Sequence, residues 1–161
     1  MIVSRSRATN RSVSTRDLAD MLYYSDPELF ILRGVPGSGK SHIATALADS
    51  GCVNSVICSA DHYFMDVDGE YRFDPTKLPD AHKACFENVR AAMERRDGRI
   101  VLDNCNVLPE HFAEYEALAA RHGYRVYHLV VERRHTGVNQ HGVPAERVDL
   151  VAEKLAANIK V

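Results

Sequence analysis

Three features are scarce in this sequence, and each absence excludes a class of protein. No apolar run approaches the roughly 20 residues that span a bilayer, and the start, residues 1–5, lacks the apolar core of a signal peptide. The formal net charge is only −2, which argues against a strongly electrostatic nucleic-acid binder. We therefore expect a cytoplasmic protein without membrane contact, in which any nucleic-acid contact is brief or confined to a groove.

Paired cysteines are also missing. The chain has four cysteines, none of them in a Cys-x-x-Cys pair, and all lie in segments that look structured: Cys52, Cys58, Cys85 and Cys105. Small buried thiols are therefore a better interpretation than disulfides or a zinc site. We expect all four to be reduced.

The composition is that of an ordinary globular domain. Of its residues, 45% are hydrophobic and 26% are charged. A chain of 161 residues is long enough to bury a core in one domain. We assign residues 27–161 to that domain. Residues 1–26 form a basic, Ser-rich arm, with a candidate short helix over residues 17–24, and a frayed terminus is its simplest interpretation.

The most informative segment runs from Gly34 to Ser41 and fits the phosphate-binding pattern of Gly, four residues, Gly-Lys and Ser or Thr. An apolar stretch that reads as a buried strand precedes it, and a helical pattern follows it. Backbone N–H groups and a helix N-terminus would therefore point at one anion. Lys40 would reach the β- and γ-phosphates, and the Ser41 hydroxyl would bind Mg²⁺. The expected nucleotide contacts are Gly34, Pro36, Gly37, Ser38, Gly39, Lys40, Ser41 and His42.

Strand and helix patterns alternate along the rest of the chain. Apolar runs predict strands, helical spacing of apolar residues predicts helices between and after them, and Gly98, Pro109 and Gly123 supply helix ends. The expected strands cover residues 29–32, 53–59, 100–102 and 126–131, and the helices lie near 42–48, 81–93, 109–123 and 148–159. This order predicts an α/β fold, a parallel sheet sandwiched by helices, with ligands at the carboxyl ends of the strands.

Acidic residues follow two of these strands. Asp61 comes after the second strand, where its carboxylate would face the phosphate loop and act as a base toward a hydroxyl acceptor. Asp103 ends the third strand, the position of the acid that holds the Mg²⁺ shell in phosphate-loop proteins. The acidic residues between 66 and 74 lack the spacing of a calcium loop, so we interpret them as a solvated turn. The eight histidines show no metal-binding spacing, and we expect four of them to lie in or near the segments that face the cleft: His62, His82, His135 and His141.

Several motifs together resemble a known family. Residues 59–64, 68–74, 81–82, 103–106 and 141–144 look like the zeta-toxin-like group of P-loop kinases, and most like its branch of polynucleotide 5′-hydroxyl kinases. The resemblance covers about residues 29–155. It implies a P-loop nucleoside triphosphate hydrolase fold of the kinase type with a lid and Asp61 as the catalytic base. It also implies that Asp103, Asn104 and Asn106 orient acceptor and metal, and we add Tyr63 and Arg72 as acceptor contacts.

Two positions depart from the family pattern. Phe64 stands where phage polynucleotide kinases carry an arginine that grips the acceptor phosphate, and Arg72 is a candidate substitute. Val138 stands where related kinases carry a lid arginine. Within or after the expected lid, residues 132–142, the charge that stabilises the transferring phosphate would come from Arg133, Arg134 or Arg147. We assign the catalytic role to Arg134 and a nucleotide contact to Arg133.

The leading hypothesis is an ATP- and Mg²⁺-dependent kinase that phosphorylates a hydroxyl on a nucleic-acid end or a nucleotide. A kinase for a small metabolite, a nucleotide sugar or a modified base in DNA shares the same donor site. A regulatory ATPase without an acceptor and a degenerate kinase that serves as a scaffold also remain open. The guanine-reading Asn-Lys-x-Asp motif of GTPases is absent.

Overall fold

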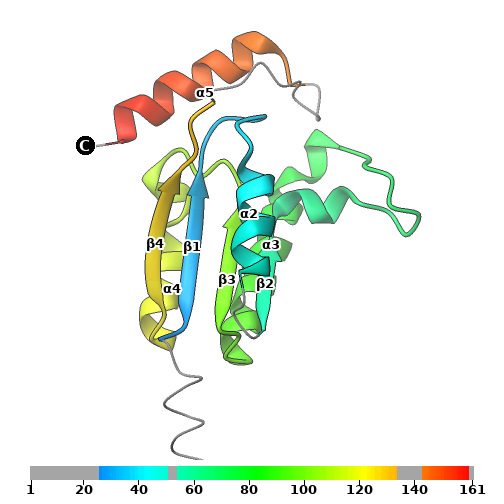
Figure 1. Cartoon of the computed structure of the whole chain (residues 1–161). Coiled ribbons are helices and arrows are strands. Elements are labelled where there is room, and N and C mark those ends of the chain that lie inside the picture. The colour runs from blue at the N-terminus through cyan, green and yellow to red at the C-terminus, as the bar shows by residue number, and fades with distance from the viewer. Residues whose placement is uncertain (1–25, 51–53, 134–142, 160–161) are drawn as a thin grey trace, which may run out of the picture.

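A parallel four-stranded sheet forms the centre of the molecule (Figure 1). The computed structural model describes residues 26–50, 54–133 and 143–159. All neighbouring strands run parallel, in the order β2-β3-β1-β4, which confirms the predicted sheet. The strands are β1 (Glu28–Arg33), β2 (Ser55–Cys58), β3 (Arg99–Asp103) and β4 (Arg125–Val130).

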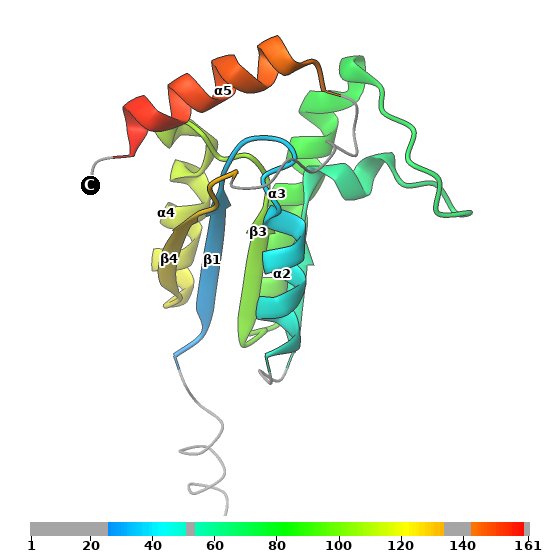
Figure 2. The same cartoon turned by 45° about the horizontal axis from the view of Figure 1, so that its top comes forward.

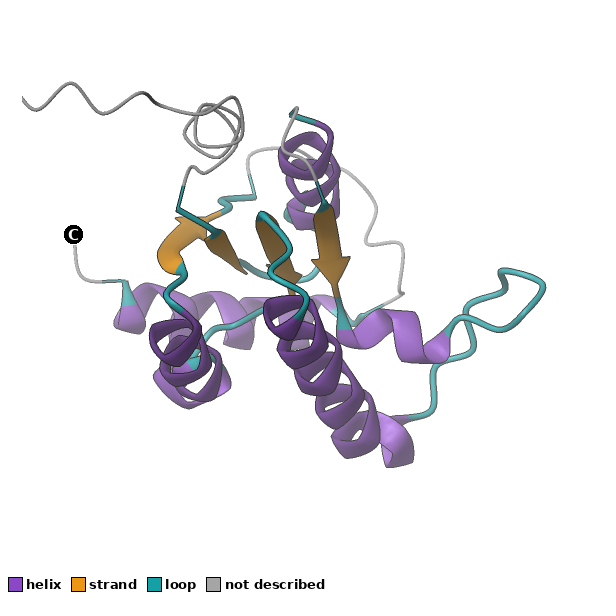
Figure 3. Cartoon of the chain, turned by 90° about the horizontal axis from the view of Figure 1, so that it is seen from below, coloured by secondary structure: helices purple, strands orange, loops and turns teal. Residues whose placement is uncertain are grey.

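Helices cover both faces of this sheet, as predicted. Figure 3 shows the sheet from below, with helices on both of its faces. Helix α2 (Lys40–Asp49) packs on one face, and α3 (Leu78–Glu94) and α4 (Ala113–His122) pack on the other. A further helix, α5 (Ala145–Asn158), lies beyond the carboxyl ends of the strands, on the side of the phosphate loop (Figures 1 and 2).

The two central strands, β1 and β3, are largely buried on both faces because helices cover both. In β3, Ile100 and Leu102 belong to the core on the side of α3 and α4, whereas Val101 between them packs with Ala44 of α2. All four side chains have no exposed surface. The short apolar runs of the sequence are therefore the signature of a doubly covered sheet.

Two helix boundaries differ from the prediction. Pro109 begins only a 3₁₀ turn, η3 (Pro109–His111), and α4 starts after Phe112, whose φ of −133° is not helical. Helix α3 ends at Glu94 rather than at Gly98, since Arg96 takes a left-handed φ of 62°. The predicted end of α4 is confirmed: Gly123 has φ 73°, a left-handed conformation that favours glycine.

The polar stretch after β2 is ordered. It contains the 3₁₀ helices η1 (Ala60–Phe64) and η2 (Pro75–Lys77), joined by a narrow loop in which Met65 pairs antiparallel with Tyr71. Figure 1 shows this loop projecting away from the sheet. The Asp66 carboxylate accepts the backbone N–H groups of Asp68 and Glu70, which confirms the predicted acidic turn.

No helix in the described part of the chain combines the length and the apolar composition that a membrane span requires. Among the same residues, no group of His, Cys, Asp or Glu side chains has the arrangement of a metal-binding cluster. Cys58 and Cys85 are buried free thiols, as expected, and Cys105 is a partly buried one. Cys52 lies outside the described residues, as do the arm and candidate helix of residues 1–25.

Candidate functional site

The phosphate loop joins β1 to α2 and needs glycine at three positions. Gly37 and Gly39 have φ values of 74° and 96°, which are left-handed. Gly34 is constrained by space instead, because a Cβ atom there would lie 2.7 Å from both the Val131 carbonyl oxygen and Ser38 Oγ. The glycines of the motif are therefore required by the backbone itself.

Two polar groups of this loop are buried. The Lys40 side chain is 9% exposed, and its Nζ donates a hydrogen bond to the Val35 carbonyl oxygen over 2.9 Å. Ser38 Oγ is buried and, among the described residues, has no hydrogen-bond partner. A buried hydroxyl without a partner is uncommon in a folded protein, and a ligand that supplies the partner is one explanation of it. Together with the N-terminus of α2, these groups fit a bound phosphate. Ser41 and His42 are exposed on the first turn of α2.

The loop that follows β3 is fastened to the start of the phosphate loop. The Gly34 N–H donates to the Cys105 carbonyl oxygen over 3.0 Å. Arg33 is buried at 8% exposure and donates to the carbonyl oxygens of Asn106 and Val107 over 3.0 and 3.1 Å. Its guanidinium also lies over the Phe112 ring, 4.9 Å from the centroid. Arg33 therefore fixes the two loops relative to each other.

Asn104 and Asn106, which we predicted to contact the acceptor, make structural contacts. Asn106 is 3% exposed, and its side-chain amide donates to the Leu32 carbonyl oxygen over 2.8 Å. Asn104 Oδ1 accepts the N–H of Ala60 over 2.9 Å, at the start of η1. Asn104 thus joins the end of β3 to the helix that carries Asp61. Their contact with an acceptor stays a prediction.

Asp61 is exposed in the first turn of η1. Its backbone N–H donates to Ser59 Oγ over 3.2 Å, and its Oδ1 atom accepts a hydrogen bond from the Tyr71 hydroxyl over 3.1 Å. Burial and the neighbouring Asp61 carboxylate raise the pKa of Tyr71 to about 12. The Tyr71 hydroxyl therefore stays protonated near neutral pH and can donate to the carboxylate.

Three predicted site residues influence the pKa of the Cys105 thiol. Burial raises the pKa of the Cys105 thiol, the Lys40 ammonium lowers it, and the carboxylates of Asp61 and Asp103 raise it further. Asp103, at the end of β3, is 8% exposed. The phosphate-loop lysine and both predicted acids thus occupy one region at the carboxyl edge of the sheet.

The pKa of His82, on α3, is also affected by groups in this region. Burial lowers the pKa of His82, His111 lowers it further, and Asp61 acts in the opposite direction. His82 is an exposed residue whose imidazole lies near enough to Asp61 to be affected by it, which is consistent with the expectation that His82 faces the cleft. His135 and His141, predicted to lie near it as well, are outside the described residues.

The structure describes some, but not all, of the other residues that we predicted to contact the acceptor or the nucleotide. Tyr63 is 45% exposed, next to Asp61 in η1. Arg72 is not a free substitute for a phosphate-gripping arginine, because its guanidinium forms ion pairs of 3.0 Å with Asp66 and with Glu70. Arg133 and Arg147 are exposed. Arg134, Val138 and most of the expected lid lie outside the described residues.

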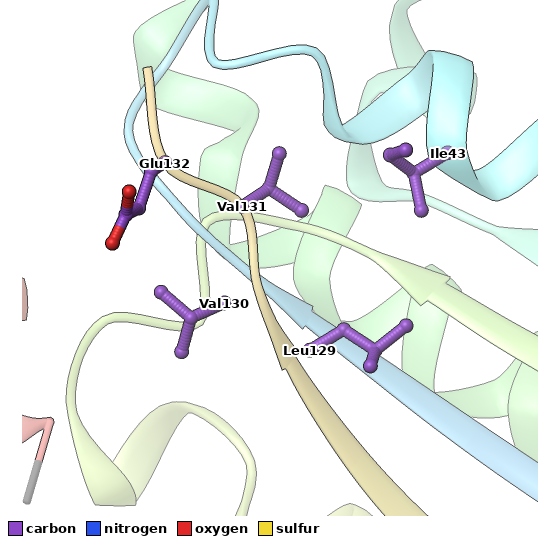
Figure 4. A pocket seen from close by; sticks show the side chains of 5 residues that line it. All are labelled: Ile43, Leu129, Val130, Val131 and Glu132. Atoms are coloured by element: carbon purple, nitrogen blue, oxygen red, sulfur yellow. The ribbon is translucent and has the colours of Figure 1, made fainter. Parts of the chain in front are cut away.

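An apolar hollow adjoins the phosphate loop on the side of β4 (Figure 4). Its volume is about 500 Å³. It lies between the first turn of α2 and the end of β4 and is lined by Ile43, Leu129, Val130, Val131 and Glu132. Four of these five side chains are aliphatic, so the hollow suits an uncharged group better than a phosphate.

Sequence reasoning missed two residues that organise the site. Tyr71 stood in one of the motifs but had no role, and only the fold brings its hydroxyl to Asp61. Arg33 stands between the apolar strand and the first glycine of the loop, and we predicted no role for it. A charged residue that directly follows a buried strand was the signal, because such a charge requires partners.

Comparisons with known proteins agree with this architecture. Residues 29–153 match the model of a family described as AAA domain. NEDD4-binding protein 2 from Homo sapiens is 38% identical over 98 residues, which are 61% of this chain and 5% of that protein. The 2′,3′-cyclic-nucleotide 3′-phosphodiesterase from Pongo abelii is 35% identical over 99 residues, 61% of this chain and 22% of that protein.

A solved structure, that of the Pnkp1/Rnl/Hen1 RNA repair complex, contains a chain with the same fold. The TM-score is 0.63 at 20% identity, over 83% of this chain and 45% of that one. This likeness shows that the two chains share the fold of a parallel sheet flanked by helices. The chain spans only a small part of the two curated relatives, so their complete activities do not transfer to it.

Proposed function

We propose that this chain, which belongs to the AAA domain family, is an ATP- and Mg²⁺-dependent kinase. The acceptor is a hydroxyl group, with the 5′-hydroxyl of a polynucleotide or a nucleotide as the leading candidate. The observation that carries the proposal is the position of Asp61. Its carboxylate accepts a hydrogen bond from a tyrosine and lies in the region of Lys40 and Asp103. A nucleotide-binding switch would not need such an acid.

The donor side of the reaction rests on the phosphate loop. Lys40 and the backbone N–H groups of residues 37–41 would bind the phosphates of ATP, and the buried Ser38 hydroxyl would gain a partner. Ser41 and Asp103 would hold Mg²⁺, whose chemistry is to neutralise charge on the phosphate oxygens. Lys40 would exchange its present hydrogen bond to Val35 for the ligand.

The acceptor side rests on Asp61. Its carboxylate would take the proton of the acceptor hydroxyl while the hydroxyl oxygen bonds to the γ-phosphorus. The bond from that phosphorus to the β–γ bridging oxygen breaks, and ADP leaves with the electron pair. Asn104 would position the base indirectly, because it holds the backbone N–H of Ala60, the residue before Asp61.

The charge that closes on the transferring phosphate is a separate part of the proposal. Arg133 and Arg147 are exposed, so neither side chain is buried against the rest of the described residues. Arg134 lies outside the described residues and remains our first candidate from the sequence.

A labelled-ATP transfer screen tests the proposal. The acceptors are oligonucleotides with a 5′-hydroxyl, nucleosides, nucleotide sugars and simple sugars, and the control without acceptor measures ATP hydrolysis. The structural likeness to a chain of an RNA repair complex makes RNA ends the first acceptors to try. Phosphate transfer to one class identifies the acceptor, whereas hydrolysis that no acceptor changes would favour the regulatory ATPase.

Two variants tie the activity to the site. Lys40→Ala should abolish transfer without changing the thermal midpoint by more than a few degrees, and Lys83→Ala, an exposed lysine on α3, is the matched control. Asp61→Asn should keep ATP affinity and lower kcat by about a hundredfold or more. Full activity in folded Lys40→Ala would refute the donor site, and an unchanged kcat in Asp61→Asn would move the base elsewhere.

A further inference from the structure

Four aromatic rings gather next to Asp61, and we call them the aromatic platform: Tyr63, Phe64, Tyr71 and Phe73. Phe64 is its centre, 5% exposed. The ring centroids of Tyr63, Tyr71 and Phe73 lie 5.5, 6.1 and 5.0 Å from that of Phe64, all in edge-to-face contact. The rings of Tyr71 and Phe73 lie within 10° of parallel. Mutual contacts thus fix the orientation of the rings.

The outer rings of the platform face solvent. Tyr63 is 45% exposed and Phe73 is 52% exposed. Seven large hydrophobic side chains are exposed in the described residues, and Tyr63 and Phe73 are the two aromatic ones among them. A single exposed apolar side chain needs no explanation, but two exposed aromatic rings of one cluster next to a candidate active site indicate a binding surface.

The platform is joined directly to the proposed catalytic base. Tyr71 belongs to it and donates its hydroxyl hydrogen to Asp61 Oδ1. Tyr63 follows Asp61 by two residues in the same 3₁₀ helix. A molecule lying on the exposed rings would therefore extend toward the carboxylate that takes the acceptor proton.

The charges around the platform decide which molecule fits. Four carboxylates surround it in sequence, namely Asp66, Asp68, Glu70 and Asp74, and the guanidinium of Arg72 is paired with two of them. Phe64, in the position of the phosphate-gripping arginine, is buried. A phosphate group at this surface would meet repulsion, whereas a flat uncharged ring would stack.

We propose that Tyr63 and Phe73 stack on the nucleobase of the acceptor, so that the acceptor is recognised by its base and not by a neighbouring phosphate. This inference rests on the proposed function for the role of Asp61. Stacking of one base on an aromatic side chain commonly changes affinity by about tenfold or more and tolerates every base, because each has a flat face. The expected acceptor class is a nucleoside or an unpaired nucleotide end.

Fluorescence tests the contact without any turnover. The chain contains no tryptophan, so Phe73→Trp introduces a single tryptophan, which can be excited apart from the tyrosines, at the platform. Val67→Trp, at a fully exposed position of the same loop, is the matched control. Each variant is titrated with a short single-stranded DNA that has a free 5′-hydroxyl, and with the same backbone carrying an abasic 5′ residue.

We expect saturable quenching only for Phe73→Trp with the base-bearing DNA. Equal quenching by the abasic DNA would mean that phosphates bind, and equal quenching in both variants would mean non-specific contact. Either result, or no quenching at all, would overturn the inference. Saturable base-dependent quenching in a protein that transfers no phosphate would keep the inference and refute the proposed kinase.

Kinetics provide the second arm. Phe73→Ala and Tyr63→Ala should each raise the KM of the acceptor about tenfold, with kcat and the KM of ATP unchanged, and Phe73→Tyr should restore the KM. Val67→Ala should behave as the parent. The KM of the acceptor should also change little with salt, because stacking releases no counterions. An active kinase whose acceptor KM ignores both substitutions would refute the inference and leave the proposed function intact.

Discussion

The hydroxyl of Tyr71 donates a hydrogen bond to Asp61 Oδ1 over 3.1 Å, although ten residues separate the two in the chain. The loop between them closes because Met65 and Tyr71 pair as an antiparallel bridge and because the Tyr71 ring packs on Phe64. The exposed carboxylate is thereby tied to a buried aromatic core. This tie gives an acid on the surface the fixed orientation that proton abstraction requires.

Removing this hydrogen bond should impair the chemical step. We expect Tyr71→Phe to lower kcat about tenfold, the usual scale for a hydrogen bond to a charged group, with little change in the KM of ATP. The pKa of Tyr71 is raised to about 12. Below pH 10 the hydroxyl is therefore protonated in almost every molecule, and the loss in kcat should be constant from about pH 6 to 9.

The measurement is the pH–rate profile of the variant beside that of Tyr127→Phe. The Tyr127 hydroxyl lies on β4 and contacts Arg125, so its removal is a matched control that should leave kcat unchanged. A defect in Tyr71→Phe that vanishes within this pH range would contradict the assignment, as would a kcat equal to that of the parent.

The second prediction concerns Asp103. If its carboxylate holds the metal shell, Asp103→Asn should raise the Mg²⁺ concentration for half-maximal activity about tenfold, and added Mg²⁺ should restore part of kcat. Asp149→Asn, an exposed acid on α5, is the control. A normal Mg²⁺ titration in a folded Asp103→Asn variant would assign the buried carboxylate a structural role instead.

The sheet could be predicted because a strand that is buried on both faces consists of consecutive apolar residues. Leu29 and Ile31 of β1, like Ile100 and Leu102 of β3, are fully buried, so each strand reads as an apolar run. The phosphate loop could also be predicted from a local pattern. Its glycines are required by left-handed φ angles and by the close approach of neighbouring backbone atoms.

The rest depends on contacts between distant residues, which no local pattern records. Asn106 is a polar residue in a position typical of a functional site, yet its side-chain amide donates a hydrogen bond to the Leu32 carbonyl oxygen, 74 positions away in the chain. Pro109 looks like a helix start, but the buried Phe112 interrupts the helical backbone. The loop after η1 is ordered because Tyr71 and Phe73 pack on Phe64. The acidic composition of the loop did not predict this packing.

The third prediction uses two glycines that differ in their surroundings. In Gly34→Ala the new Cβ would lie 2.7 Å from the Val131 backbone oxygen, so the loop or the end of β4 must move. We expect loss of ATP binding and a lower thermal midpoint. In Gly69→Ala the Cβ has nothing within 4 Å, and only the left-handed φ of 81° is strained, at a cost of about 1 kcal/mol.

Calorimetric ATP titration and thermal unfolding separate the two. Gly69→Ala should bind ATP as the parent does and unfold a few degrees lower, because its strain is local to the projecting loop. If Gly34→Ala bound ATP with parental affinity, the close packing of the phosphate loop against residue 131 would not matter for the donor site.

The last prediction concerns the arginine that stabilises the transferring phosphate. An arginine in that role contributes roughly 10³-fold or more to the rate, whereas a solvated surface arginine contributes almost nothing. Single substitutions Arg133→Ala, Arg134→Ala and Arg147→Ala should therefore give one large defect in kcat at saturating ATP, which we expect for Arg134. Arg90→Ala is the control, because Arg90 is paired with Glu87 and Glu94 on the exposed face of α3. If all three variants match the parent, no arginine in this part of the chain closes on the phosphate. The valine at position 138 would then mark a protein that binds nucleotide without transferring it efficiently, and the scaffold hypothesis would gain support over the kinase.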